Sequence, residues 1–163
     1  MGNIYFSENE IVELGVQIEK NGKDFYNTLA AKFKDEKVKE ICKFLAEQEE
    51  KHIGIFSKIL ESVDKSASQP RESYAGESSA YMNALANGNV FTQKNKGNEV
   101  AKAVKNEKDA LDVALGFEKD SIVFFEGMKK IIPQKNHKSI NWLIEEEQKH
   151  IVQLFDLRNK LKT

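Results

Sequence analysis

Apolar residues recur every three or four positions over four long stretches of the chain. This is the period of an α-helix, and no comparable stretch shows the strict alternation of a half-buried strand. We expect the helices at about residues 7–33, 35–64, 107–131 and 138–161. Ser7 followed by Glu10 is a capping-box signature for the first helix, and Pro133 ends the third. The pattern therefore predicts an all-α protein.

The segment between the second and third helices has a different composition. Residues 65–98 are rich in Ser, Gly and Asn, include Pro70, and have no long periodicity. We expect a short helix near residues 81–86 and a short turn at 99–104. A connection of this length suits a crossover along a bundle better than a tight turn. The prediction is a four-helix bundle with a long crossover between helices 2 and 3.

The two halves of the chain resemble each other. Residues 44–53 (FLAEQEEKHI) recur as residues 142–151 (WLIEEEQKHI), and residues 18–20 (IEK) recur as residues 117–119 (FEK). Two amphipathic hairpins can look alike through composition alone. The charged positions match here as well as the apolar ones, which favours a repeated helix pair.

The second and fourth predicted helices each carry a Glu and a His inside an apolar stripe. Residues three apart lie on the same helix face, and burying an ionised carboxylate without a partner is strongly unfavourable. A single Glu-x-x-His is more often a surface pair, but these two pairs occupy repeat-equivalent positions on apolar stripes. The stripes are Cys42, Leu45, Glu49, His52, Phe56, Ile59 and Val63, and Ile140, Leu143, Glu147, His150, Leu154, Leu157 and Leu161.

The first and third helices offer one carboxylate each, Glu19 and Glu118, at equivalent repeat positions. Gly15 and Gly22 lie about one turn either side of Glu19, and Ser121 follows Glu118. Taken singly, each Glu reads as a surface residue of a charged helix. As a pair with small neighbours, they are predicted to face inward and to leave room for a metal and an added ligand.

Four carboxylates and two imidazoles form the two-metal pattern of four-helix carboxylate proteins, which are ferritin-like in fold. Mixed oxygen and nitrogen ligands favour two non-haem iron ions, with manganese or zinc as substitutes. The predicted metal ligands are Glu19, Glu49, His52, Glu118, Glu147 and His150.

These motifs resemble the di-iron domain of rubrerythrins. The resemblance rests on EKNGKDFY at 19–26, EEKH at 49–52, FEKDSIVFF at 117–125 and EEEQKH at 145–150, and it spans all four long helices. It implies an oxidoreductase that reduces hydrogen peroxide, with dioxygen as a second oxidant. By this resemblance two Glu residues bridge the irons, two bind one iron each, each His caps one iron, and a tyrosine supports the site. The residues in these roles are Glu49 and Glu147, Glu19 and Glu118, His52 and His150, and Tyr26.

The chain departs from the family pattern after its third-helix ligand. Typical rubrerythrins carry a further carboxylate one turn after the residue that corresponds to Glu118, and the family associates it with iron movement and efficient peroxide reduction. This chain has Ser121 there. Glu126 is a poor replacement, because it lies about 80° from Glu118 around the helix. We therefore expect six protein ligands and a weaker preference for peroxide over dioxygen.

The composition of the chain excludes several classes of binding partner and metal site. A net charge of −1 excludes a global field for nucleic acid, and no apolar run reaches the length of a membrane span. The lone Cys42 excludes an intrachain disulfide and a cysteine-only metal site.

We expect one domain over residues 1–163, a cytoplasmic location without a secretory signal, and a homodimer. The paired cysteines of a rubredoxin domain are missing, so the electron donor is expected to be a separate protein. Trp142 and the phenylalanines are assigned to the core, and His137 to a solvated turn.

Two other functions compete with this interpretation. One is iron binding and storage in a ferritin-like shell. The other is a structural bundle with a metal-free polar core, which is disfavoured because four clustered carboxylates repel one another without cations.

Overall fold

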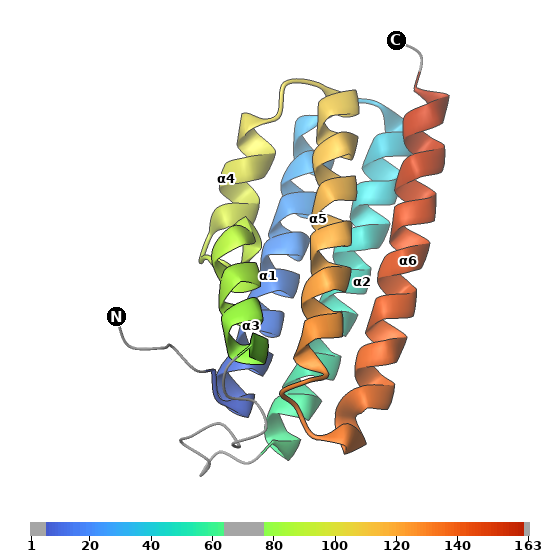
Figure 1. The fold of residues 1–163 in the computed structure, drawn as a ribbon. Coiled ribbons are helices and arrows are strands. Elements are labelled where there is room, and N and C mark those ends of the chain that lie inside the picture. The colour runs from blue at the N-terminus through green and yellow to red at the C-terminus, as the bar shows by residue number, and fades with distance from the viewer. Residues whose placement is uncertain (1–5, 64–76, 162–163) are drawn as a thin grey trace.

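The computed structural model describes residues 6–63 and 77–161, and all regular structure in these ranges is helical (Figure 1). Four long helices form the bundle, as predicted. They are α1 (Glu8–Lys32), α2 (Glu36–Ser62), α5 (Glu107–Met128) and α6 (His137–Lys160). Pro70 and the first part of the expected Ser-rich connection, residues 65–76, lie outside the described residues.

The sequence signals at the helix ends act as predicted. The Ser7 hydroxyl accepts from the Glu10 amide, while the Glu10 carboxylate accepts from the Ser7 amide, which completes the capping box of α1. Asp35 caps α2 by accepting from the Val38 amide at 3.0 Å. These bonds satisfy backbone donors that the first helical turn leaves free. Helix α5 ends at Met128, three residues earlier than expected, because the chain turns tightly from there toward Pro133.

The crossover consists of α3 (Glu77–Gly88), the 3₁₀ turn η2 (Val90–Thr92) and α4 (Lys96–Ala103). In Figure 1, α2 descends to one end of the bundle and α5 starts at the other, so the crossover runs back along the bundle beside α1 and α5. The long crossover is confirmed. Helix α3 is longer than the sequence pattern predicted. It buries only a narrow face, formed by Ser79, Met82 and Ala86, and so few apolar positions gave a weak periodic signal.

Helix α4 is held against α1 at both of its ends. The buried Asn21 side chain accepts from the Gly97 amide at 3.0 Å and donates to the carbonyls of Phe91 and Gln93, both at 2.6 Å. At the other end, the Lys32 ammonium donates to three carbonyls at the end of α4 and just beyond it. These carbonyls belong to Ala101, Lys102 and Val104. A helix this short gains little from propensity alone, so these contacts fix its position.

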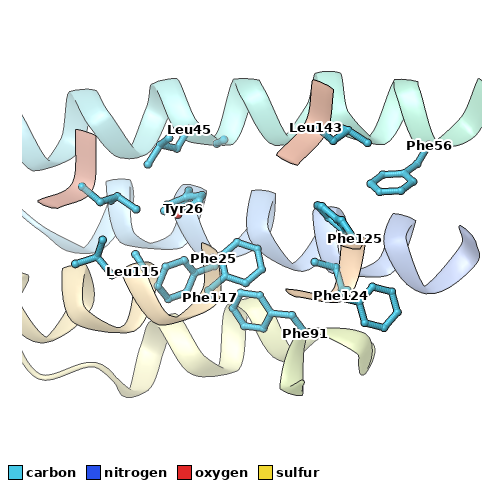
Figure 2. Packing of buried hydrophobic residues seen from close by; sticks show 14 of the residues in the cluster. Phe25, Tyr26, Leu45, Phe56, Phe91, Leu115, Phe117, Phe124, Phe125 and Leu143 are labelled. Atoms are coloured by element: carbon cyan, nitrogen blue, oxygen red, sulfur yellow. The ribbon is translucent and has the colours of Figure 1, made fainter. Parts of the chain in front are cut away.

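Aromatic rings fill the space between α1, α5 and the crossover (Figure 2). Phe91 of η2 lies 4.3 Å from Phe117 and 5.7 Å from Phe25, measured between ring centroids. Phe56 and Phe125 pair in the same way at 5.1 Å. This cluster surrounds the middle of the bundle with apolar material.

The sequence led us to expect Trp142 and all the phenylalanines in the core, and the structure corrects this expectation. Trp142 is 41% exposed, and Phe44 and Phe155 are exposed as well. These residues lie on α2 and α6, while the crossover packs on α1 and α5. The side chains therefore reach a face of the bundle that the crossover leaves open. No helix among the described residues is both long and apolar enough to cross a membrane.

Gly97 provides a test of how the crossover is docked. A Cβ atom at this position would lie 2.1 Å from the carbonyl oxygen of Asn21, a backbone atom that cannot move alone. We expect Gly97→Ala to lower the free energy of unfolding by about 2 kcal/mol, as overpacking typically does. Urea denaturation followed by circular dichroism measures the change.

Gly116 on α5 is the matched control, because a Cβ there would meet nothing within 4 Å. Gly116→Ala should stabilise the protein by about 0.5–1 kcal/mol through helix propensity. Equal effects of the two substitutions would contradict the close approach of α4 to α1.

Candidate metal centre

The six residues predicted as ligands come together in the middle of the bundle. Each of the four long helices contributes, and all six side chains are at most 2% exposed. Both apolar stripes face inward as predicted: every member is buried except Leu161, which is partly exposed. The residues that the sequence brought into one set are Glu19 on α1, Glu49 and His52 on α2, Glu118 on α5, and Glu147 and His150 on α6.

The Glu147 carboxylate lies between the two imidazoles. Its Oε1 atom is 3.0 Å from Nδ1 of His52, and its Oε2 atom is 2.8 Å from Nδ1 of His150. Glu49 also approaches both, at 3.7 Å from His52 and 3.6 Å from His150. Glu19 approaches only His52, at 3.4 Å, and Glu118 approaches only His150, at 3.6 Å.

These atoms form two overlapping groups that could each hold a cation. One group consists of Glu19, Glu49, His52 and Glu147, and the other of Glu49, Glu118, Glu147 and His150. Within each group the ligand atoms lie within 4.8 Å of one another. Glu49 and Glu147 belong to both groups, so their two oxygens are placed to be shared between neighbouring cations.

The donor atoms fit such cations and lack other partners. Among the described residues, both oxygens of Glu19, Glu49 and Glu147 and both ring nitrogens of the two histidines are buried without a hydrogen-bond partner outside the cluster. Buried polar groups in native proteins are normally satisfied. Orphaned acceptors gathered at one point therefore indicate a missing positive partner, and carboxylate with imidazole is a donor set for iron or manganese.

The electrostatics of the cluster agree with this. Burial, and then the charge of Glu147, raise the pKa of Glu19 to about 7. Burial also raises the pKa of Glu49 and of Glu118, and neighbouring carboxylates raise both further. Burial opposes charge on His150, but its contacts with Glu118 and Glu147 raise its pKa to about 10. Without metal the cluster therefore retains protons that a cation would displace.

Tyr26 reaches the cluster from α1. Its hydroxyl is buried and donates a hydrogen bond to Oε1 of Glu118 across the bundle. Burial, and then the charge of Glu118, hold the pKa of Tyr26 well above its ordinary value, so the hydroxyl keeps its proton. The repeat-equivalent residue is Phe125, which has no hydroxyl, and Glu19 has no hydrogen-bond partner among the described residues.

The glycines beside Glu19 do not leave open space, which corrects the sequence-based expectation. A Cβ on Gly15 would meet the Phe56 ring at 2.7 Å, and a Cβ on Gly22 would meet the Phe117 ring at 2.8 Å. The small residues admit aromatic rings against the helix. The rings pack the surroundings of the cluster with apolar atoms.

Ser121 is buried one turn after Glu118, and its hydroxyl donates to the Phe117 carbonyl at 3.0 Å. Glu126 is exposed and pairs with Lys129 at 2.6 Å, so it does not reach the cluster. Cys42 is fully buried, and burial raises its pKa to about 12, as expected for a small apolar side chain. His137 is partly buried, and its ring lies 3.2 Å from the Ile132 carbonyl.

Two contacts near the centre were missed from the sequence. Asn21 anchors the crossover two residues after Glu19. Its position three residues after Ile18 and four before Phe25 places it on the apolar stripe of α1, and a polar residue there was a usable signal. Trp142 is the second: its ring packs edge-on against the His52 ring, with centroids 5.9 Å apart. Its match with Phe44 in the repeat concealed this contact.

Comparison with known proteins agrees with the fold. The profile of the rubrerythrin family matches residues 10–93, just over half of the chain, and the chain belongs to this family. A crystal structure from Thermotoga maritima, assigned as a ferritin-like diiron-carboxylate protein, superposes with a TM-score of 0.68 at 22% identity. The match covers 98% of this chain and 99% of that one, and it establishes the ferritin-like fold. No curated protein matches the chain significantly.

The raised pKa values predict how metal-free protein responds to pH. A raised pKa in the folded state stabilises it below the unfolded value, and the stabilisation is lost as pH rises through the folded value. For Glu19 the window is 4.5 to about 7, and for His150 it is 6.5 to about 10. Chelated protein should therefore melt at a lower temperature at pH 9 than at pH 6.

Added ferrous or manganous ion should offset this loss, because a ligand that binds only the folded state stabilises it. The difference in melting temperature between loaded and chelated protein should grow from pH 6 to pH 8. Differential scanning fluorimetry under anaerobic conditions measures both. A chelated protein that becomes more stable toward pH 9 would contradict a proton-loaded cluster.

Proposed function

We propose that this protein is a non-haem di-iron oxidoreductase of the rubrerythrin type, which reduces hydrogen peroxide with electrons from a separate donor. The observation that carries the proposal is the Glu147 carboxylate, with one oxygen toward each of two facing imidazoles in the buried core of the bundle. This arrangement gives two cations one shared ligand. Family membership supports the same chemistry.

In the proposed site, two iron ions would be held by the six buried residues, with Glu49 and Glu147 shared between the two candidate groups. Glu19 and His52 would complete the first group, and Glu118 and His150 would complete the second. The assignment follows which carboxylate approaches which imidazole. Four carboxylates balance the charge of two divalent ions, which relieves the repulsion that burial otherwise intensifies.

When bound, two ferrous ions together supply the two electrons that convert peroxide and two protons into two water molecules. The chain's own residues prepare for this. The Tyr26 hydroxyl holds one oxygen of Glu118 in place and keeps a proton beside the centre. The rings of Phe56 and Phe117 exclude bulk water from the side of α1.

Metal stoichiometry tests the ligand set. We expect two iron ions per chain in the purified protein, measured by elemental analysis. The combined change Glu49→Gln and Glu147→Gln should abolish binding of both ions, because each residue is shared. Replacing Glu145 and Glu50, which are exposed beside the two motifs, should leave both ions bound. Retention of two ions by the Glu49 and Glu147 variant would contradict the proposed site.

Oxidant preference tests the missing seventh carboxylate. Reduced iron-loaded protein should react with peroxide, but with a peroxide-to-dioxygen rate ratio lower than that of a seven-ligand rubrerythrin, because Ser121 cannot act as a movable carboxylate ligand. Ser121→Glu should raise the ratio, and Ser121→Ala, which removes only the bond to the Phe117 carbonyl, should not. Stopped-flow absorbance with each oxidant separately gives both rates.

A ratio that is already high in the native protein and unchanged by Ser121→Glu would contradict this account.

Iron storage is the alternative function, and it predicts uptake of many irons per chain by a very large assembly. A homodimer remains our prediction for the enzyme. Light scattering with the iron count separates the two, because the proposed enzyme holds two irons per chain in a small oligomer.

A further inference from the structure

The face formed by α2 and α6 carries two grooves. The first has a volume of about 420 Å³ and lies where α6 begins. The second, of about 510 Å³, lies at the opposite end of the same two helices. The crossover packs on α1 and α5, so neither groove is lined by it.

The two grooves differ in charge. The charged side chains that line the first groove are Lys58 and Lys138, with no carboxylate among its lining residues. The second groove is lined by two lysines and two carboxylates, so its charges balance. The first groove is therefore complementary to an anion. Ser139 and the first turn of α6 add hydrogen-bond donors on the same side, whereas the Ser62 hydroxyl already donates to the Ile59 carbonyl.

Apart from Asn136, the remaining lining residues of the first groove are apolar. Ile55, Ile59 and the half-buried Trp142 ring line it. A volume of this size is within the range of cofactor sites, which combine apolar and aromatic walls with a few polar groups. A tryptophan face favours stacking with a planar aromatic ring. The groove thus matches a molecule with a flat ring and an anionic tail.

Trp142 also connects the groove to the cluster. Its ring meets the His52 ring edge-on at 5.9 Å, and the His52 ring stacks on the His150 ring at 5.4 Å and an interplanar angle of 15°. A row of three rings therefore runs from the exposed groove to both groups of candidate ligands. The lining of the second groove includes neither Trp142 nor any residue of the candidate cluster.

We propose that this groove binds reduced flavin mononucleotide, and that its electrons enter the metal centre through Trp142 and His52. The phosphate would lie at Lys58 and Lys138, and the ring against Trp142. The electron-transfer part rests on the proposed function, whereas binding does not. Each turnover converts one dihydroflavin and one hydrogen peroxide into one oxidised flavin and two water molecules.

The chemistry favours a flavin over a nicotinamide. A nicotinamide gives up a hydride, which must reach its acceptor by contact, and the Trp142 ring lies between the groove and His52, the nearest member of the cluster. A flavin can release its two electrons one at a time. The proposed electron donor is therefore a small molecule, whereas the sequence led us to expect a separate protein as the electron donor.

Binding is measured first, by fluorescence. Trp142 is the only tryptophan in the chain, so quenching of intrinsic fluorescence reports directly on this groove. Oxidised flavin mononucleotide, which carries the same ring system and phosphate as the reduced form and cannot reduce the centre, should quench it saturably when added to the protein as purified. The double change Lys58→Gln and Lys138→Gln should weaken binding by about tenfold or more, since charge-assisted contacts to phosphate are lost. Riboflavin, which lacks the phosphate, should bind weakly and respond little to the same change.

Lys37 and Lys160 supply the matched control, because they line the second groove on the same two helices. Lys37→Gln with Lys160→Gln removes the same charge and should alter the affinity by less than about twofold. Absence of saturable quenching, or equal effects of the two lysine pairs, would overturn the site. Dissociation of a dimer by Trp142→Lys would also overturn it, because the groove would then be a contact between two copies of the chain.

Electron entry is measured second. Anaerobic stopped flow should show oxidation of dihydroflavin by the oxidised iron-loaded protein, slowed about tenfold or more by Trp142→Leu and less by Trp142→Phe. Flavin that binds but never reduces the centre, in protein that consumes peroxide with dithionite, would overturn electron entry. If peroxide is not consumed with any reductant, the proposed function fails, and the fluorescence result still decides the binding site.

Discussion

Four carboxylates buried within a few ångströms of one another are the constraint on which this structure depends. Each would be costly alone, and together they repel. Two imidazoles offset part of the cost, and Glu147 takes the largest share of it by contacting both. The bundle places these six groups at one level of four helices. The apolar stripes above and below supply the stability that the polar level takes away.

The crossover is built around that level. Asn21 follows Glu19 by two residues and fixes the start of α4 and the end of η2 through its side-chain amide. Phe91 then packs on Phe117, the residue before Glu118 (Figure 2). The connection therefore supports the two helices that contribute single carboxylates. The other two helices, which carry the Glu-x-x-His pairs, face solvent and grooves on their outer side.

Most of this arrangement could be predicted from the sequence because it is periodic or repeated. The stripes of α2 and α6 identified the Glu and His positions, and the repeat selected Glu19 and Glu118 from many other carboxylates. Trp142 shows where such reasoning stops. Its place in the helical pattern and its match to Phe44 indicate only that the position is apolar. Whether the Trp142 side chain is exposed depends on which face of the bundle the crossover covers. Likewise, the sequence shows that Gly22 is small. It does not show that the Phe117 ring, from a helix almost a hundred residues later, fills the space beside it.

The repeat is imperfect at one position with chemical meaning. Tyr26 gives Glu118 a hydrogen-bond donor, and its counterpart Phe125 gives Glu19 none. A carboxylate that shares its charge with a phenol is a weaker electron donor than one that does not. Cations held by the two halves would therefore differ in reduction potential, although the sequence motifs around them are repeated. A duplicated scaffold would in this way offer two metal positions that are not chemically equivalent.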